Sequence, residues 1–389
     1  MKKVFIRGPV FTQSGYGVHS RQIARWLVER NNIDLYVGAL PWGITPWHLT
    51  PDAQNGLIGK LMNFSKPMEG QADVSFQVQL PNEWDPKIAK FNVGVTAAVE
   101  TDRASPEWVN HCNAMDAIVV PSEHSAKSLT NAGEVKVPMY VIPESFHDSI
   151  ALPDEALPEC PLGETSTKHN FLVFGQITGT NPYNDRKNIF FTIRWLCEEF
   201  KDNPDVGIVL KTNTARNTKI DRERVFQMTT DLIKEVRVGE FPRIHVIHGS
   251  LTDEQVATIY RHPSVKALVA ITRGEGYGLP ILEAAVSGLP VIATPWSGHM
   301  DFMKHGRFIQ VHYDLKEIHS SRIDNKIFVP GTRWAEASEA DFKRRVRKFY
   351  DNSLKPNEWA AALKNKLLNM YGFEKIANIY EDTFKEQLT

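Results

Sequence analysis

The amino-acid sequence predicts an α/β fold in which two doubly wound parallel sheets, each covered by helices, follow one another along the chain. Three observations support this. The chain has 389 residues, and one hydrophobic core seldom grows beyond about 250–300 residues. Short Val- and Ile-rich runs alternate with amphipathic helical patterns, which is typical of a parallel sheet buried on both faces. The alternation stops once, over residues 151–170, where proline and acidic residues replace any hydrophobic period.

The first domain is expected over residues 1–155. Apolar runs bounded by turn residues predict strands over 2–8, 33–40, 72–80, 91–99, 117–121 and 139–143. Amphipathic patterns predict helices over 19–31, 105–115 and 122–133, and Ser122 is the expected N-cap of the last one.

A linker over 156–170 and a second domain over 171–370 are expected next. The same patterns predict strands over 171–177, 206–212, 244–249, 267–272 and 290–294, with helices between them. The chain ends in three amphipathic helical segments that begin at Ser338. The last of these, within 371–389, is expected to return to the first domain.

Composition and charge exclude several classes of protein. The net charge is -1, so there is no global reason to expect nucleic acid or an anionic membrane as a partner. No stretch approaches the ~20 apolar residues that span a bilayer, and Arg7 interrupts the only apolar start. Cys112, Cys160 and Cys197 have no metal-ligand spacing and predict a reducing, cytoplasmic location. No metal motif occurs, so no metal is expected.

The stretch "RGEGYGLPILEAA" from Arg273 follows the strand predicted over 267–272, at a carboxyl end where doubly wound sheets bind ligands. Pro280 suits the first helical position, which leaves the amides before it as a helix N-terminus that attracts phosphate. Glycines let a ligand approach the backbone, and the carboxylates of Glu275 and Glu283 suit pairs of hydroxyls. Together these features favour a nucleotide-sugar site; the alternative is a strand–turn–helix with Glu283 as an N-terminal helix charge.

Four stretches resemble one family. "EGYGLPILEAAVSGLPVIAT" resembles the E-x7-E signature of retaining GT-B glycosyltransferases of family 4. "GPVFTQSGYGVHSRQIARWL" resembles their amino-terminal glycine loop and first helix, and "VFGQITGTNPYNDRKNIFFTIRWL" the start of their donor domain. "AAVETDRASPEWVNHCNAMDAIVVPSEHSAKSL" resembles a stretch of their acceptor domain. The resemblance implies two Rossmann-like domains facing a cleft and metal-independent, retaining transfer of a hexose from a nucleotide-sugar to an acceptor hydroxyl. UDP-glucose is the default donor and a co-substrate, and no cofactor is implied.

The resemblance also implies roles for single residues. Glu275 would contact hydroxyls of the donor sugar, Glu283 would hold the ribose hydroxyls, and Lys187 would neutralise the departing diphosphate, with Arg186 beside it. The remaining donor-binding candidates are Gly15, Gly17, Ser250, Leu251, Arg273, Gly276, Tyr277, Gly278 and Leu279. Many family members carry an arginine after the glycine that ends the first donor-domain strand, where this chain has Gln176. Arg186, Lys211 or Arg273 would replace that cation.

Glu100 and Asp102 follow another predicted strand, also at a carboxyl end. They either orient or deprotonate the acceptor hydroxyl or are solvated loop acids. The family often has a histidine in this region.

Other functions stay open. A related GT-B enzyme would be a nucleotide-sugar epimerase or a sugar phosphorylase, and a non-catalytic nucleotide-sugar binder would not need the leaving-group cation Lys187. A transferase that acts on a hydroxymethylated base in phage-type DNA needs a basic groove, which Arg21, Arg25 and Arg30 on the first helix would supply. The same arginines would alternatively meet an anionic lipid surface or solvent. The acceptor is therefore a glycan, a lipid or modified DNA.

Overall fold

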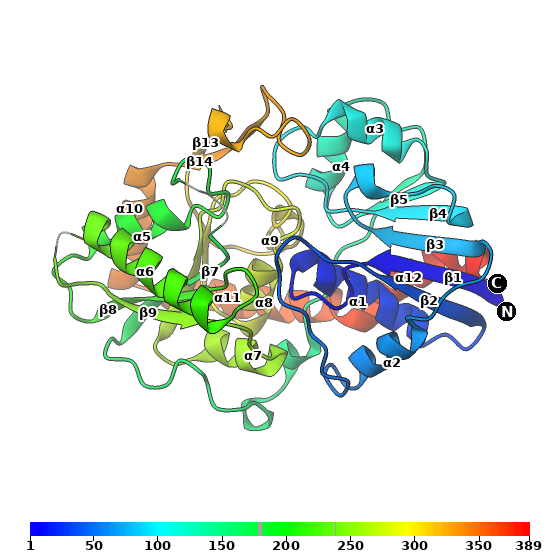
Figure 1. Ribbon diagram of the computed structural model, residues 1–389. Coiled ribbons are helices and arrows are strands. Elements are labelled where there is room, and N and C mark those ends of the chain that lie inside the picture. Colours follow the sequence, from blue (N-terminus) through cyan, green and yellow to red (C-terminus); the bar gives the residue numbers. More distant parts are fainter. Residues whose placement is uncertain (178–180, 238) are drawn as a thin grey trace. The chain divides into compact units, whose positions relative to one another are not determined.

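The computed structural model describes residues 1–177, 181–237 and 239–389 (Figure 1). They divide into two compact units. The first unit comprises Met1–Ser145, Asp324–Val329 and Phe373–Thr389, and the second comprises Phe146–Ile323 and Pro330–Gly372. Each unit contains one six-stranded sheet in which all neighbouring strands are parallel. The predicted fold class, with two doubly wound α/β domains, is therefore confirmed.

The first sheet has the strand order β2-β1-β3-β4-β5-β6. Its strands are β1 (Lys2–Gly8), β2 (Ile33–Ala39), β3 (Ala72–Val78), β4 (Ala89–Val95), β5 (Ala117–Val120) and β6 (Met139–Val141). The helices of this unit are α1 (Gly15–Val28), α2 (Leu57–Phe64), α3 (Pro106–Cys112), α4 (Glu123–Thr130) and α12 (Phe373–Leu388), and a 3-10 helix spans Pro81–Glu83. Ser122 caps α4 as predicted, since its side chain accepts a hydrogen bond from the amide of Ser125.

Helix α12 completes the core of the first unit, although it is the last element of the chain. The rings of Tyr380 and Phe384 pack within 5.4 Å of Trp26 and 5.3 Å of Phe76, respectively. Tyr380, Phe384 and Leu388 are all buried in the cluster that also contains Val4 and Ile6 of β1. Helix α12 stays packed on the first sheet because its separation would expose these large apolar side chains to water.

Of the three arginines that would supply a basic groove, Arg21 and Arg25 lie in α1 and Arg30 follows its end. Arg21 is buried, and its guanidinium donates to the carbonyl oxygens of Val10 and Thr12 at 2.9 and 2.8 Å. Arg25 lies over the ring of Phe373 at 3.7 Å, and Arg30 pairs with Glu381 of α12. Arg21 is therefore not available to a DNA phosphate, whereas the side chain of Arg25 is 36% exposed; a DNA or lipid acceptor stays a prediction.

The second sheet has the strand order β12-β11-β10-β7-β8-β9. Its strands are β7 (His169–Phe174), β8 (Val206–Thr212), β9 (Arg243–His248), β10 (Val265–Ala270), β11 (Val291–Ala293) and β12 (Ile309–Gln310). The chain runs outward from β7 to β9, returns to β10 beside β7, and continues the other way. This switch point between β7 and β10 is where doubly wound sheets bind ligands.

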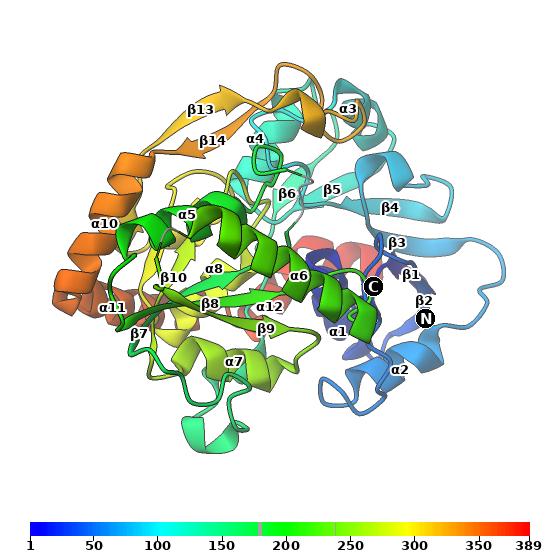
Figure 2. The same ribbon diagram turned by 60° about the vertical axis from the view of Figure 1, so that its left-hand side comes forward.

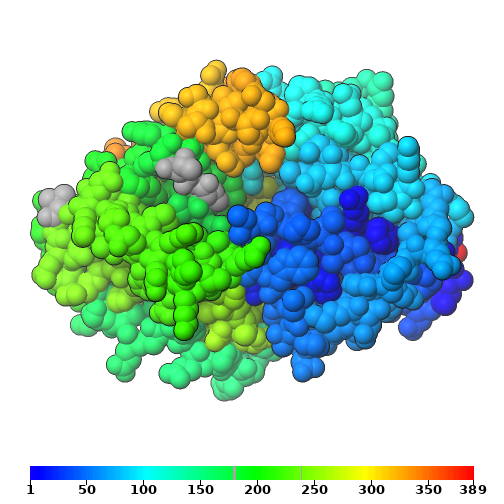
Figure 3. Space-filling view, viewed as in Figure 1, coloured from blue at the N-terminus to red at the C-terminus, as the bar shows by residue number. Residues whose placement is uncertain are grey.

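Helices cover both faces of the second sheet. The helices of this unit are α5 (Ile189–Glu199), α6 (Lys219–Val236), α7 (Asp253–Arg261), α8 (Leu279–Ser287), α9 (Met300–Met303), α10 (Glu339–Asp351) and α11 (Leu354–Met370), with 3-10 helices at Asp148–Ala151, Asp154–Ala156 and Ser320–Arg322. Helix α5 lies beside α6 and α10 (Figure 2), and apolar residues of these three helices share one cluster. Apolar residues of α7, α8 and α11 share another. Helix α6 lies at the surface (Figure 3), where Ile220 and Phe226 are exposed.

The division between the units falls at Ser145, about ten residues before the expected boundary at 155. Phe146 and Ile150 are buried in the core of the second unit. Arg261 of α7 also donates to the carbonyl oxygens of Ile150 and Leu152. These contacts attach the segment before the Pro-rich stretch to the second unit. The amino-acid composition shows only where the hydrophobic periodicity stops, and therefore places the boundary later.

The strands β13 (Tyr313–Glu317) and β14 (Arg333–Ala337) follow β12 along the chain. They pair with each other as an antiparallel hairpin and form a separate two-stranded sheet. The sequence predicts no strand there, because "YDLKE" is largely polar. In the structure, four of the five residues of β13 are exposed. Among the described residues, no helix is long and apolar enough to cross a membrane.

Candidate functional site

The loop between β10 and α8 is shaped by close contacts of its backbone. The Glu275 amide donates to Ser297 Oγ at 2.9 Å, and the Glu275 carbonyl accepts from the Gly298 amide at 2.9 Å. A Cβ on Gly298 would lie 2.0 Å from the Gly276 carbonyl oxygen, so only glycine fits there. Gly278 has φ +102°, a left-handed conformation that favours glycine. The two loops therefore fold against each other at the carboxyl end of β10.

Helix α8 begins at Leu279, so Pro280 is its second residue rather than the first residue that the sequence predicts. Within the described part of the chain, the amides of Gly278 and Leu279 donate to no protein acceptor. Free amides at a helix N-terminus attract anions. The Tyr277 ring is buried and packs edge-on against Phe302 at 5.3 Å, which places this side chain in the core.

Three charged residues meet beside this loop. Lys187 Nζ lies 2.7 and 2.9 Å from the two carboxylate oxygens of Glu275, and Arg186 Nη1 lies 3.2 Å from one of them. Glu275 is 5% exposed. Burial alone would raise the pKa of its carboxyl, but the charges of Lys187 and Arg186 outweigh burial and lower the pKa to about 2. The carboxylate is thus ionised throughout the neutral range, with a net positive charge around it.

The segment before α5 brings both cations to Glu275. The Asp185 carboxylate accepts the amide of Ile189, the first residue of α5. Asn188 has φ +55°, and its side-chain amide donates to the Ile271 carbonyl at 3.1 Å. A Cβ on Gly175 would lie 3.4 Å from Lys187 Cγ. Lys187 therefore lies along the end of β7, at the switch point of the sheet.

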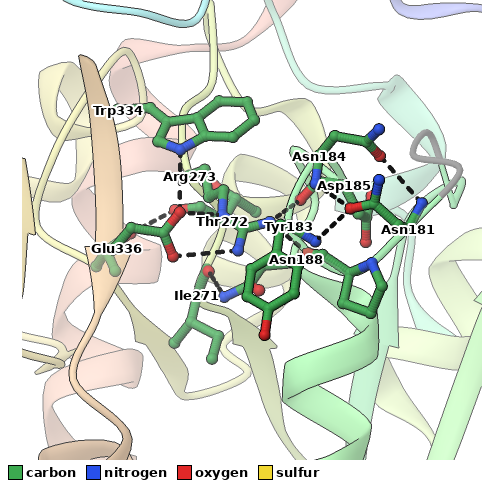
Figure 4. A network of polar contacts seen from close by, with 12 residues as sticks. Asn181, Tyr183, Asn184, Asp185, Asn188, Ile271, Thr272, Arg273, Trp334 and Glu336 are labelled. Carbon is green, nitrogen blue, oxygen red and sulfur yellow. Dashed lines mark hydrogen bonds and ion pairs between the residues drawn. The ribbon is translucent and has the colours of Figure 1, made fainter. Parts of the chain in front are cut away.

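Arg273 is not placed as a replacement for the missing phosphate cation. It is 1% exposed, and its guanidinium holds both carboxylate oxygens of Glu336 at 2.6 and 3.1 Å. Its other terminal nitrogen donates to the carbonyl oxygens of Pro182 and Asp185 (Figure 4). Four of the five donors of a guanidinium are thereby directed at protein groups.

Lys211 is a better-placed cation. It is the second-last residue of β8 with 3% of its surface exposed, and burial lowers the pKa of its ammonium to about 8. Its Nζ donates to Asn213 Oδ1 at 2.6 Å and to the Gly249 carbonyl at 2.9 Å. These are neutral acceptors. Among the described residues, no carboxylate forms an ion pair with Lys211; its Nζ lies 5.8 Å from the centre of the Phe174 ring.

The predicted base-binding residues follow Gly249 directly. Ser250 is exposed, and its hydroxyl accepts from the Asn217 side chain at 2.9 Å. Leu251 is half-buried against the core formed by α7 and α8. Thr252 caps α7 by accepting from the Gln255 amide. Because Lys211 holds the Gly249 carbonyl, the positions of this loop and of the lysine are linked.

Glu283 lies one helical turn into α8, away from the two cations. Tyr260 donates its hydroxyl hydrogen to the Glu283 carboxylate at 3.1 Å. Burial, together with the nearby charge of Asp253, raises the pKa of Glu283 to about 7. Asp253 in turn lies 2.9 Å from His147 Nε2. Burial lowers the pKa of His147, but Asp253 outweighs burial and raises it overall.

The sequence does not predict the residues that surround Glu283, which are Tyr260, Asp253 and His147. Asp253 reads as an ordinary acidic residue in the first turn of a helix, and His147 lies outside the expected second domain. Their association with Glu283 is tertiary. No local pattern signals it.

The candidates in the first unit lie around the start of α1. The Gly17 amide donates to Ser14 Oγ at 3.0 Å, and a Cβ on Gly17 would lie 2.2 Å from the Thr12 carbonyl oxygen. Gly17 is thus required by packing in a capped helix start. A Cβ on Gly15, in contrast, would have no atom within 4 Å, which leaves space beside that backbone.

Glu100 and Asp102 lie in the loop after β4, and both are half-buried. The Asp102 carbonyl accepts the side-chain amide of Asn131 at 2.8 Å. Near them, Tyr16 donates to or accepts from Thr96 Oγ1 at 2.9 Å and accepts the Ala97 amide. Burial raises the pKa of Tyr16 above its ordinary range, so its hydroxyl stays protonated. An acceptor role for the two carboxylates stays a prediction.

In the described residues, no group of three or more His, Cys, Asp or Glu side chains is arranged to hold a metal ion.

Comparisons with known proteins show what this chain resembles in sequence and in fold. Residues 241–365, which contain the Glu275 loop and α8, match the family model of glycosyl transferases group 1. A curated relative, the probable sucrose-phosphate synthase of Thermosipho melanesiensis, is 25% identical over 223 residues, which make up 56% of this chain and 45% of that protein. The match therefore spans less than half the length of this curated relative.

Two solved structures resemble nearly the whole chain. HepE from Anabaena, in complex with UDP and glucose, has a TM-score of 0.65 at 14% identity and covers 99% of this chain and 100% of its own. A sucrose-phosphate synthase from Thermosynechococcus elongatus has a TM-score of 0.61 at 13% identity, with 99% of each chain covered. At such identities the likeness concerns the fold. The chain thus consists of two parallel-sheet, Rossmann-like domains of the GT-B type, and residues 241–365 of its second unit match the family model of glycosyl transferases group 1.

Proposed function

We propose that the protein is a metal-independent, retaining glycosyltransferase that moves a hexose from a nucleotide-sugar to an acceptor hydroxyl in the cytoplasm. One observation carries the proposal. Lys187 and Arg186 surround the buried carboxylate of Glu275 next to the unbonded N-terminal amides of α8. A helix N-terminus with two cations suits a diphosphate, and a carboxylate with a pKa of about 2 suits sugar hydroxyls as a permanent acceptor.

The proposed roles follow from this arrangement. The diphosphate binds at the amides of Gly278 and Leu279, within reach of Lys187. As the bond between the anomeric carbon and the diphosphate oxygen breaks, negative charge develops on that oxygen. A fixed ammonium aimed at developing charge is usually the largest catalytic term. The acceptor oxygen bonds to the anomeric carbon on the same face, and its proton passes to the departing diphosphate.

Glu283 is proposed to receive the ribose hydroxyls. Its carboxylate accepts only one hydrogen bond from the described residues, that of Tyr260, and a carboxylate has about four acceptor positions. Ser250, Leu251 and the carbonyl-bound Lys211 lie at the end of the adjacent strands and are proposed to contact the base. UDP-glucose is the first donor to test, because HepE was crystallised with UDP and glucose.

Thermal shift with nucleoside diphosphates and nucleotide-sugars tests the proposal. A ligand at 100 times its Kd adds about 2.7 kcal/mol of stability. We expect UDP or UDP-glucose to raise the Tm of the wild type and to have much less effect on Glu283→Ala. Glu358→Ala, which removes an exposed carboxylate of α11, is the matched control and should respond like the wild type.

Release of UDP from UDP-glucose, with water as acceptor, then separates a transferase from a binder. A folded wild type that binds no nucleotide would refute the proposal. Binding without any UDP release, and without a changed sugar, would instead favour a non-catalytic binder; a changed nucleotide-sugar without release would favour an epimerase.

A further inference from the structure

Arg273 connects the two segments that make up the cation–carboxylate cluster. Its amide donates to the Arg186 carbonyl at 2.9 Å, and its guanidinium donates to the Asp185 carbonyl at 2.6 Å. These are the two residues directly before Lys187. Glu275, the partner of Lys187, follows Arg273 by two positions. Arg273 therefore ties the segment before Lys187 directly to the strand end that leads into Glu275.

Arg273 is itself held from the opposite side. Glu336 of β14 binds it with both carboxylate oxygens, and the Trp334 indole also donates to Glu336 at 3.0 Å. The Ala335 amide donates to the Arg273 carbonyl at 2.9 Å. Figure 4 shows the guanidinium between Glu336 and Trp334 on one side and the segment that contains Asp185 on the other. The hairpin thus serves as the anchor for Arg273.

The chemistry of this position requires arginine. A planar guanidinium binds a carboxylate with two parallel bonds and still reaches two carbonyls, which a lysine ammonium does not reproduce. A buried charge of this kind is tolerated only when it is fully paired. The Trp334 ring, with its centre 5.2 Å from the guanidinium carbon, adds a favourable face for the cation. The geometry of the Lys187 segment is therefore fixed more tightly than a surface loop would be.

We propose that Arg273 and Glu336 are positioning residues that set Lys187 against the diphosphate, and that they act through Lys187 without touching the substrate. The inference rests on the proposed function, because it assigns the purpose of a contact within the same site. A cation displaced by about 1 Å reduces turnover by about 10²-fold, while binding of the ground-state donor changes much less.

The test is a double-mutant cycle on UDP release from UDP-glucose, with kcat and KM measured separately. Arg273→Lys and Glu336→Gln are each made in the wild type and in Lys187→Met. We expect either change alone to lower kcat by about 10²-fold, with KM and the Kd of UDP changed by less than about 10-fold. In the Lys187→Met background, neither change should lower kcat further, because the group through which they act is absent.

A purely structural role gives a different result, since a loss of folded protein lowers kcat by the same factor in both backgrounds. Multiplicative losses would therefore overturn the inference, as would an unchanged kcat in both single variants. If Arg273→Lys does not fold, the cycle with Glu336→Gln decides alone, because glutamine keeps one acceptor for the guanidinium. Arg347→Lys, in the half-exposed pair with Glu199, is the control for loss of an arginine in the same unit. A wild type that neither binds nor releases UDP would refute the proposed function itself, and the positioning role with it.

Discussion

Replacement of Glu275 by glutamine removes the negative charge from the centre of the cation–carboxylate cluster. The side chain is 7% exposed, and the partner cations Lys187 and Arg186 are 15% and 14% exposed. In Glu275→Gln, the amide has nearly the same shape but removes the negative charge that Glu275 presents to two partly buried cations. Breaking one partner of a buried ion pair is strongly destabilising, by about 3–5 kcal/mol.

The pKa of Glu275 gives a second measure of how much its charge stabilises the folded state. A fall from 4.5 to about 2, at about 1.4 kcal/mol per unit, corresponds to about 3 kcal/mol in favour of the folded state. Because the folded pKa is the lower one, this contribution is complete above pH 4.5 and is lost as the pH falls towards 2. For a unit of about 150–250 residues, 1 kcal/mol shifts Tm by about 2–4 °C. Glu275→Gln should therefore lower Tm by roughly 6–12 °C at pH 7.

The assay is calorimetric unfolding of the wild type and Glu275→Gln between pH 7 and pH 3, without nucleotide. Glu29→Gln is the matched control, because it breaks an exposed pair with Arg25 at 3.4 Å and should cost less than about 1 kcal/mol. The difference in Tm between the wild type and Glu275→Gln should become smaller below pH 4.5. Equal shifts for both variants, or a gap that does not change with pH, would refute the reasoning that the cluster is a buried, charge-coupled site.

Three further outcomes are expected. Lys187→Met should lower the rate of UDP release by about 10²–10³-fold, as loss of a preorganised electrostatic group does, with Arg194→Met as a surface control. The KM for UDP-glucose should fall as the pH rises through about 7, because Glu283 ionises there and only its carboxylate accepts two ribose hydrogen bonds; in Glu283→Gln this dependence should vanish. The free energy of unfolding of the wild type should rise as the pH rises from about 8 to 10.5. In this range Lys211 has lost its proton in the folded state but keeps it in the unfolded state. Lys211→Met should lack that gain, and an unchanged pH profile by urea unfolding would count against the buried ammonium.

The sequence is sufficient to predict every strand of both sheets except the two-residue β12 (Ile309–Gln310), because each longer strand carries its own signal. Val4 and Ile6, or Leu172 and Val209, are apolar at positions that a buried parallel strand requires on both faces. The loop before α8 is predictable for a similar reason, since glycine and proline restrict the backbone locally. The hairpin of β13 and β14 lacks such a signal, because its first strand is polar and its pairing is made with residues about twenty positions away.

The association of charges is much less predictable. Lys187 and Glu275 are 88 positions apart, and only the resemblance to a family brings them together from the sequence. His147 and Asp253 beside Glu283 have no such motif. Their effect on the pKa of Glu283 depends on distances that only the fold supplies.

The arginines show why charge alone is a poor guide to a phosphate site. Arg21 and Arg273 both follow or precede glycine-rich loops and both read as anion ligands, yet each is buried and donates to backbone carbonyls. A guanidinium with five donors in a fixed plane is suited to bind loop carbonyls. Lys187 has a flexible stem and pairs with Glu275 beside the start of α8, so we expect it to exchange that carboxylate for a ligand oxygen at a smaller cost. In each unit, then, a buried arginine holds a loop, and in the second unit Lys187 is the cation that we propose acts on the substrate.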